Sequence, residues 1–253
     1  MKHFALFVLL LALAACGGTS SKPTPAKAAP VYFHVDPSSA GAISGSIRFA
    51  GKRPAARRIS MDAEQDCQKL HKTPVYEELV KTGKAGGPAN VFVYVKSGLE
   101  GKTFEPPATA VVIDQQGCQF APRVVALRAG QTLEVKNSDP VSHNIHPMPR
   151  NNRDWNQQQP PGSPDLLRRF GYPEVMIPVK CNIHNWMRTY IGVLQHPYFA
   201  VTGDDGAFTF DPLPPGRYTV AAWHETLGEA SQEVEVKAGA KAPVAFTFRL
   251  PAP

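Results

Sequence analysis

The sequence is poor in charge, and the charge it has is dispersed. Charged residues make up 19% of the chain and hydrophobic residues 43%, a balance that excludes wholesale disorder. The formal net charge of +6 is too small and too dispersed to indicate a nucleic-acid-binding protein. With 253 residues, the chain is long enough for one large domain or two ordinary ones.

The sequence also lacks an apolar run long enough to span a bilayer. Its longest one, from Phe4 to Ala15, follows Lys2 and predicts a secretory signal over residues 1–15. The run ends in Leu-Ala-Ala-Cys-Gly, which resembles the lipobox of bacterial lipoproteins and implies that Cys16 becomes lipidated. An ordinary signal with an incidental cysteine is the alternative. Residues 16–40 would then be a lipid anchor and flexible tether, and we expect a periplasmic protein held at the outer membrane.

Proline is abundant, with 25 residues, nearly twice the usual ~5%. This excludes a helical bundle and, with alternating apolar and polar segments, predicts an all-β fold. One short helix is expected over 62–71, and a long polar loop over 147–173, whose length suggests a function. The expected strands cover 43–49, 91–95, 109–114, 123–127, 132–136, 176–180 and 189–194.

Four cysteines are present, and an exported chain can form disulfides. Cys16 is assigned to the lipid, and Cys181 lies among potential metal ligands, which leaves Cys67 and Cys118 as a disulfide pair. Closing a loop of about fifty residues would restrict the unfolded chain by roughly 4 kcal/mol. Two buried free thiols are the alternative.

Soft metal donors are concentrated in two segments, Ser-His-Asn-Ile-His from 142 to 146 and Cys181-x-x-His184-x-x-Met187. One thiolate, two imidazoles and one thioether differ from the oxygen ligands of calcium or magnesium and from the four thiolate or imidazole ligands of structural zinc. Two His, one Cys and a weak axial Met describe a blue-copper electron-transfer site. Copper is therefore the cofactor that fits best.

These segments resemble the cupredoxin family, and the ligand loop is similar to that of amicyanin and pseudoazurin. Upstream residues 119–122, 130–133 and 136–139 look like the cupredoxin entry strands. The resemblance implies a Greek-key β-sandwich over 104–196 and one type 1 copper site. It implies as site residues the ligands His143, Cys181, His184 and Met187, with Asn144 tying the ligand loops together. Ile183, Trp186 and the loop 147–173 depart from the family pattern and leave the loop geometry open.

The flanking sequence has a second signature. Residues 203–210 and 213–220 resemble a carboxypeptidase regulatory-like, transthyretin-like β-sandwich. The resemblance implies that 41–100 supplies its first strands and 197–250 the remainder, with the cupredoxin inserted between them. Two tandem modules with shared strands would give almost the same sequence pattern as this insertion.

Other side chains near the predicted site have two interpretations each. His146 is expected to pack near the metal ligands without binding metal, and a role as a ligand is the alternative. Trp186 is either core filling or part of an apolar shell that tunes the metal. Four arginines in the long loop either are solvated or dock an acidic redox partner: Arg150, Arg153, Arg168 and Arg169.

These features together favour one-electron transfer by a site that cycles between Cu(II) and Cu(I), and not an enzyme. A redox partner is implied, such as a cytochrome c, a periplasmic dehydrogenase or an oxidase. The runner-up is a copper storage or delivery lipoprotein, which the five methionines support poorly. No His-x-His motif occurs, which argues against a multicopper enzyme.

Overall fold

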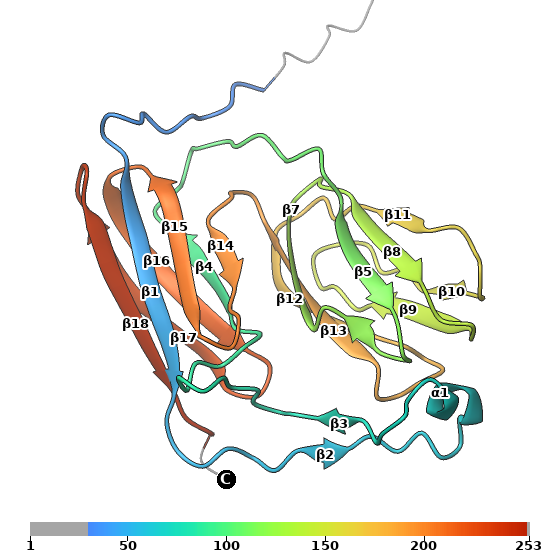
Figure 1. Cartoon of the computed structure of the whole chain (residues 1–253). Helices are drawn as coiled ribbons and strands as arrows, with labels where there is room; N and C mark the ends of the chain where they lie inside the picture. The colour runs from blue at the N-terminus through green and yellow to red at the C-terminus, as the bar shows by residue number, and fades with distance from the viewer. Residues whose placement is uncertain (1–29, 252–253) are drawn as a thin grey trace, which may run out of the picture. The chain divides into compact units, whose positions relative to one another are not determined.

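The computed structural model describes residues 30–251 (Figure 1). Its compact unit begins at Val31, and the predicted signal over 1–15 and Cys16 lie outside the described residues. Among residues 30–251, no helix is long and apolar enough to cross a membrane.

The outer sandwich, as we call it, is built from both ends of the described chain. Strand β1 (Gly41–Phe49) lies between β15 (Ala207–Leu213) and β18 (Lys241–Phe248), antiparallel to the first and parallel to the second (Figure 1). The other sheet of the outer sandwich has the order β14 (Phe199–Val201), β4 (Phe92–Ser97), β16 (Gly216–His224) and β17 (Gly228–Val236). Both sheets bury alternate side chains in one core, as the predicted alternation requires.

The inserted sandwich comes from the middle of the chain. One sheet has the order β10 (Gln157–Gln159), β9 (His143–Pro147), β12 (Glu174–Lys180), β13 (Arg188–Leu194) and β7 (Val124–Arg128). The other has the order β11 (Leu166–Arg168), β8 (Leu133–Asn137), β5 (Val111–Gln115) and β6 (Phe120–Ala121). The two sheets share a second buried core. The predicted all-β fold is confirmed.

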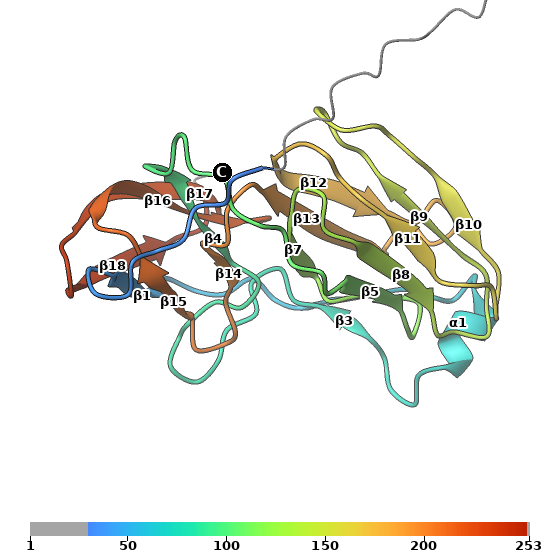
Figure 2. The ribbon, with the colours of Figure 1, turned by 90° about the horizontal axis from the view of Figure 1, so that it is seen from above.

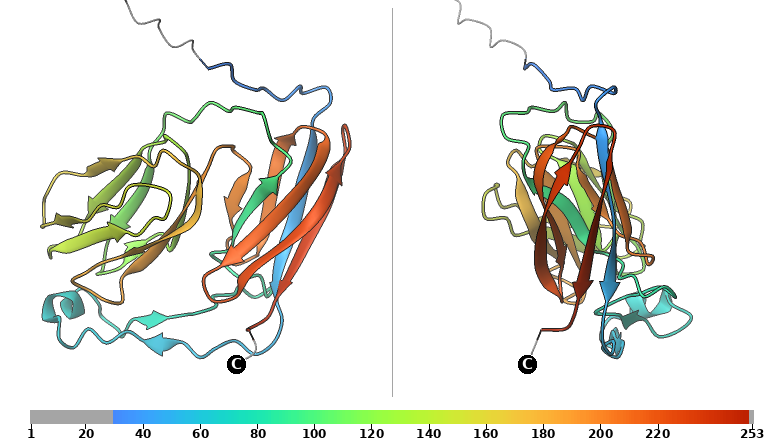
Figure 3. Two further views of the ribbon diagram at one scale, coloured as in Figure 1. Left: turned by 180° about the vertical axis from the view of Figure 1, so that it is seen from behind. Right: turned by 90° about the vertical axis from the view of Figure 1, so that its left-hand side faces the viewer.

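Three predicted segments differ from the structure. The expected loop over 147–173 contains two short strands, because β10 pairs with β9 and β11 with β8. Within 41–100, the chain leaves the outer sandwich as the ladder of β2 (Arg57–Arg58) and β3 (Tyr76–Glu77), with α1 (Gln65–Lys69) between them (Figure 3). This excursion buries Met61 and Cys67 in the core of the inserted sandwich. At the end of the expected tether, Phe33 packs against the outer core, and its backbone N–H donates to Thr103 O (2.6 Å).

A third, smaller apolar cluster joins the two sandwiches. It combines Phe92 and Ala221 of β4 and β16 with Val124, Met176 and Leu194 of β7, β12 and β13. The strands that carry these residues are labelled in Figure 2. Close packing here requires a glycine in β13, because a Cβ atom on Gly192 would stand 2.6 Å from the Phe92 ring. The inserted sandwich therefore contacts the outer one through packed side chains as well as through the connecting chain.

Candidate metal centre

The predicted ligands lie where three strands of the inserted sandwich end or begin. β12 ends at Lys180, and β13 begins at Arg188, so residues 181–187 form the loop between two antiparallel neighbours. Within this loop the Met187 N–H donates to His184 O (3.0 Å), and the Cys181 N–H donates to Met187 O (3.2 Å). His143 is the first residue of β9. β9 pairs with the edge of β12 that does not pair with β13. The sheet thus holds the loop beside the first residue of β9.

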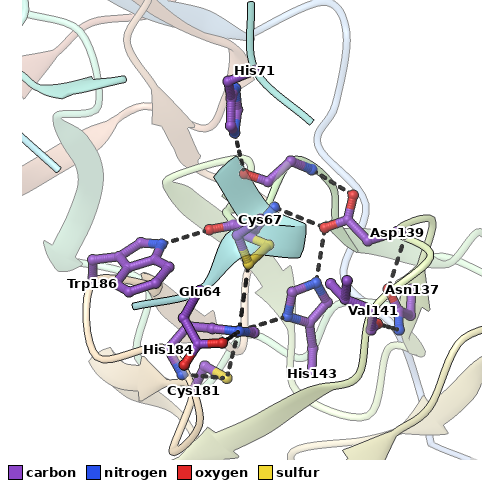
Figure 4. The surroundings of a disulfide bond; sticks show 12 residues. Glu64, Cys67, His71, Asn137, Asp139, Val141, His143, Cys181, His184 and Trp186 are labelled. Carbon is purple, nitrogen blue, oxygen red and sulfur yellow. Dashed lines mark hydrogen bonds and ion pairs between the residues drawn. A yellow bond between two sulfur atoms is a disulfide. The ribbon is translucent and has the colours of Figure 1, made fainter. Parts of the chain in front are cut away.

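Three of the predicted donors converge in this position. His143 Nδ1 and His184 Nδ1 are 3.0 Å apart, and Cys181 Sγ is 3.9 Å from His184 Nδ1 (Figure 4). The side chains are 0%, 3% and 2% exposed for His143, His184 and Cys181. All three donor atoms lie within 4.8 Å of one another. Met187 is buried in the same core. A small cation among these atoms would receive lone pairs from two imidazoles and one sulfur.

The environment of Cys181 favours its thiolate. Burial raises the pKa of the thiol, but hydrogen bonds from the His143 and His184 side chains and from the His184 backbone outweigh that effect. The result is a pKa of about 6, below the usual value for a cysteine. Since the thiolate is the form that binds metals, the site presents it at neutral pH.

Asp139 orients the first imidazole. Its Oδ2 lies 2.8 Å from His143 Nε2, and its carboxylate accepts the backbone N–H groups of Gly117 and Cys118 at 2.7 Å each. Burial raises the pKa of Asp139, but the hydrogen bonds from His143 and the two backbone groups bring it below its usual value. A carboxylate at Nε2 places the proton on that nitrogen, which leaves the Nδ1 lone pair directed at the site. Sequence reasoning missed Asp139, because nothing in the local sequence marks it as a buried acceptor.

The second imidazole has different neighbours. His184 Nε2 lies 3.5 Å from Cys67 Sγ and 4.0 Å from Glu64 Oε2 (Figure 4). The structure joins Cys67 to Cys118 by a disulfide, as the sequence predicted, and Cys181 is the free cysteine of residues 30–251. The Trp186 ring packs on His184 with centroids 5.2 Å apart. Helix α1 and its disulfide therefore cover the side of His184 that faces away from the other ligands.

Of the remaining predicted site residues, Asn144 and Trp186 support the site and His146 lies beside it. Asn144 Oδ1 accepts the Asn182 N–H (2.9 Å), so it links β9 to the ligand loop as expected of a tie. Trp186 Nε1–H donates to Cys118 O (2.9 Å), which makes it more than core filling. His146 is half-buried, and its ring nitrogens lie 3.2 Å from Asp154 Oδ1 and 3.4 Å from Asn182 Oδ1.

Two of the loop arginines differ in their surroundings. Arg168 lies over the ring of Trp155, with the guanidinium carbon 5.3 Å from the ring centroid. Arg150 is exposed in the segment after β9, and its backbone N–H donates to Glu174 Oε1.

No family model and no curated protein match the sequence. Among solved structures, a copper-containing nitrite reductase from Thermus scotoductus SA-01 is similar with a TM-score of 0.32 and 21% identity, over 39% of this chain and 25% of that one. An oxidised single-substitution variant of amicyanin is similar with a TM-score of 0.30 and 17% identity, over 40% of this chain and 97% of that one. Both likenesses are partial and weak.

Proposed function

We propose that this protein is an exported copper protein that carries single electrons through a type 1 site. His143, Cys181 and His184 would be the strong ligands, and Met187 the weak axial one. The observation that supports this best is the convergence of two Nδ1 atoms and a thiol of lowered pKa in a buried position. Copper, when bound by such a donor set, supplies a Cu(II)/Cu(I) couple.

The surrounding residues suit a carrier because they leave the ligands little freedom. His143 is fixed by Asp139, and the ligand loop is fixed by Asn144 and by its own backbone hydrogen bonds. A ligand set that cannot rearrange keeps nearly the same geometry in both oxidation states, which lowers the cost of moving an electron. The burial of all three donors also keeps water away from the site.

The visible spectrum tests the proposal. Cu(II) added to the purified protein should produce an intense thiolate-to-copper band, which Cu(II) sites without a thiolate lack. Cys181→Ser should abolish the band, and the matched control His146→Ala should retain it. Binding of Cu(II) without the band would favour a copper storage or delivery protein, and a band that survives Cys181→Ser would show that the ligands are assigned wrongly.

The proposed location follows from Cys16 and has its own test. A lipid on Cys16 would hold the protein at the outer membrane, facing periplasmic partners such as a cytochrome c, a dehydrogenase or an oxidase. Cys16→Ser should move the protein from the membrane fraction to the soluble periplasmic fraction. Retention of the variant in the membrane fraction would exclude the lipid anchor.

A further inference from the structure

A second group of potential donors lies directly behind His184. The sulfurs of Cys67 and Cys118 and the Nε2 atom of His184 lie within 4.8 Å of one another, and all three residues are buried. The carboxylate of Glu64, at the start of α1, is 4.0 Å from the same nitrogen (Figure 4). These atoms share only one residue, His184, with the proposed copper site.

The chemistry of this group depends on the state of the disulfide. Sulfur atoms joined to each other are poor metal ligands, whereas two thiolates and an imidazole are the donors that Zn(II) and Cu(I) prefer. Reduction breaks the S–S bond: a dithiol reductant delivers two electrons and two protons and becomes a disulfide itself. The two new thiols lose their protons when a metal binds.

We propose that reduction of Cys67–Cys118 creates a second metal site for a thiophilic ion, Zn(II) or Cu(I). Both sulfurs and His184 Nε2 would be its ligands, with the Glu64 carboxylate as the fourth donor. His184 would bridge the two sites, with Nδ1 facing the first and Nε2 the second. This inference goes beyond electron transfer and adds a metal-binding state that the thiol redox balance controls.

The observed geometry requires only small movements. Two sulfurs bound to one zinc ion, each at about 2.3 Å, stand less than ~4.6 Å apart, so the bonded sulfurs have only to separate around the ion. His184 is 3% exposed, and its Nε2 already faces Cys67 Sγ at 3.5 Å. Cys67 is carried by a five-residue helix on the excursion between β2 and β3, outside both sandwich sheets. A shift of this helix can therefore adjust the sulfur without breaking a sheet.

The test uses the full chain carrying Cys16→Ser and Cys181→Ser, in which Cys67 and Cys118 are the only cysteines left. The protein is reduced with a phosphine in denaturant, refolded without oxygen and titrated with Co(II) as the probe for Zn(II). Alkylation counts the free thiols, and near-ultraviolet circular dichroism checks the fold. The reduced protein should bind one Co(II) with a thiolate-to-cobalt band, and the oxidised protein should show no such band.

Further variants assign the ligands. In the same background, His184→Ala should weaken Co(II) binding at least tenfold, whereas His146→Ala should leave it unchanged. The proposal is overturned if the refolded reduced protein gives no band, if His184→Ala leaves the affinity unchanged, or if the reduced chain does not regain the native dichroism. Because this background lacks Cys181, its result does not depend on whether the blue-copper band of the wild type appears.

Discussion

At the scale of single residues, the two converging imidazoles differ in what holds their outer nitrogens. His143 Nε2 bonds to a buried carboxylate, whereas His184 Nε2 faces the sulfur of a disulfide. The first arrangement fixes the orientation and the tautomer of the ring, and the second fixes mainly its position. The site is thus supported more strongly on the β9 side than on the α1 side.

Removing the charge of Asp139 tests this support. Asp139→Asn keeps an acceptor atom but loses the charge that three donors share. We expect metal affinity to fall by about 10- to 100-fold and the free energy of unfolding to fall by about 1–3 kcal/mol. Metal titration and denaturant unfolding measure the two effects. The exposed carboxylate of Asp154 provides the control, since Asp154→Asn should change neither quantity.

Met187 tests the assignment of the axial ligand. Because the axial bond of a type 1 site is long and weak, Met187→Leu should keep copper and colour. Its reduction potential should rise, since an apolar axial position favours Cu(I). Voltammetry measures the potential, and Met148→Leu is the matched control. A Met187→Leu protein that loses the visible band would mean that the thioether holds the copper itself.

The convergence of His143, Cys181 and His184 could be predicted because cysteine and histidine are scarce here and their spacing is readable from the sequence alone. Asp139 could not, since one of 21 acidic residues has no local mark that separates a buried acceptor from a solvated one. The contact between the disulfide and His184 could not be predicted either. It depends on where the segment that carries α1 packs against the core of the inserted sandwich.

At the scale of elements, runs of apolar residues predicted seven strands, including β5, β7, β8, β12 and β13 of the inserted sandwich, and polar composition concealed β10. β10 consists of three glutamines, and Gln159 at its end is fully buried. Its amide accepts from Gln115 Nε2 (2.7 Å) and donates to Val135 O (3.1 Å). A buried side chain that satisfies its hydrogen bonds internally has the same sequence signal as an exposed one, so the segment reads as a loop.

Replacing this glutamine measures what the buried amide contributes. Gln159→Leu removes both hydrogen bonds and leaves Val135 O without that donor. We expect the free energy of unfolding to fall by about 1–3 kcal/mol. Gln158→Leu changes the exposed neighbour in the same strand and should stay within ~0.5 kcal/mol. Urea unfolding of the metal-free proteins measures both free energies of unfolding. Equal effects of the two changes would contradict the burial of Gln159.

At the scale of the whole molecule, the connection from β13 to β14 carries the chain back from the inserted sandwich to the outer one. His196 lies in this connection, where burial and the nearby Arg128 guanidinium lower its pKa to about 4. Arg128 is itself held by the backbone carbonyls of Phe104 (2.9 Å) and Gln195 (2.6 Å). A neutral histidine and a buried cation thus lie together between the two cores.

This histidine predicts acid sensitivity. Its folded pKa lies below the unfolded value of about 6.5, so the unfolded chain takes up the proton first as the pH falls. Its contribution to stability is therefore complete above about pH 6.5 and is lost progressively toward pH 4. His196→Gln should make the free energy of unfolding depend less on pH in this window, as measured by urea unfolding of the metal-free protein. An unchanged pH dependence would show that His196 is solvated.

The pairing of β1 with β18 also has a consequence for how the chain matures. These strands are parallel neighbours from Ala42 opposite Lys241 to Phe49 opposite Phe248, although almost the whole described chain lies between them. Synthesis runs from the N-terminus, so one edge of β1 stays unpaired until β18 has been made. The inserted sandwich has all its strands between these two and can close first. An interrupted chain would therefore carry a finished metal pocket beside an unpaired strand edge, which is a target for quality-control proteases and a starting point for aggregation.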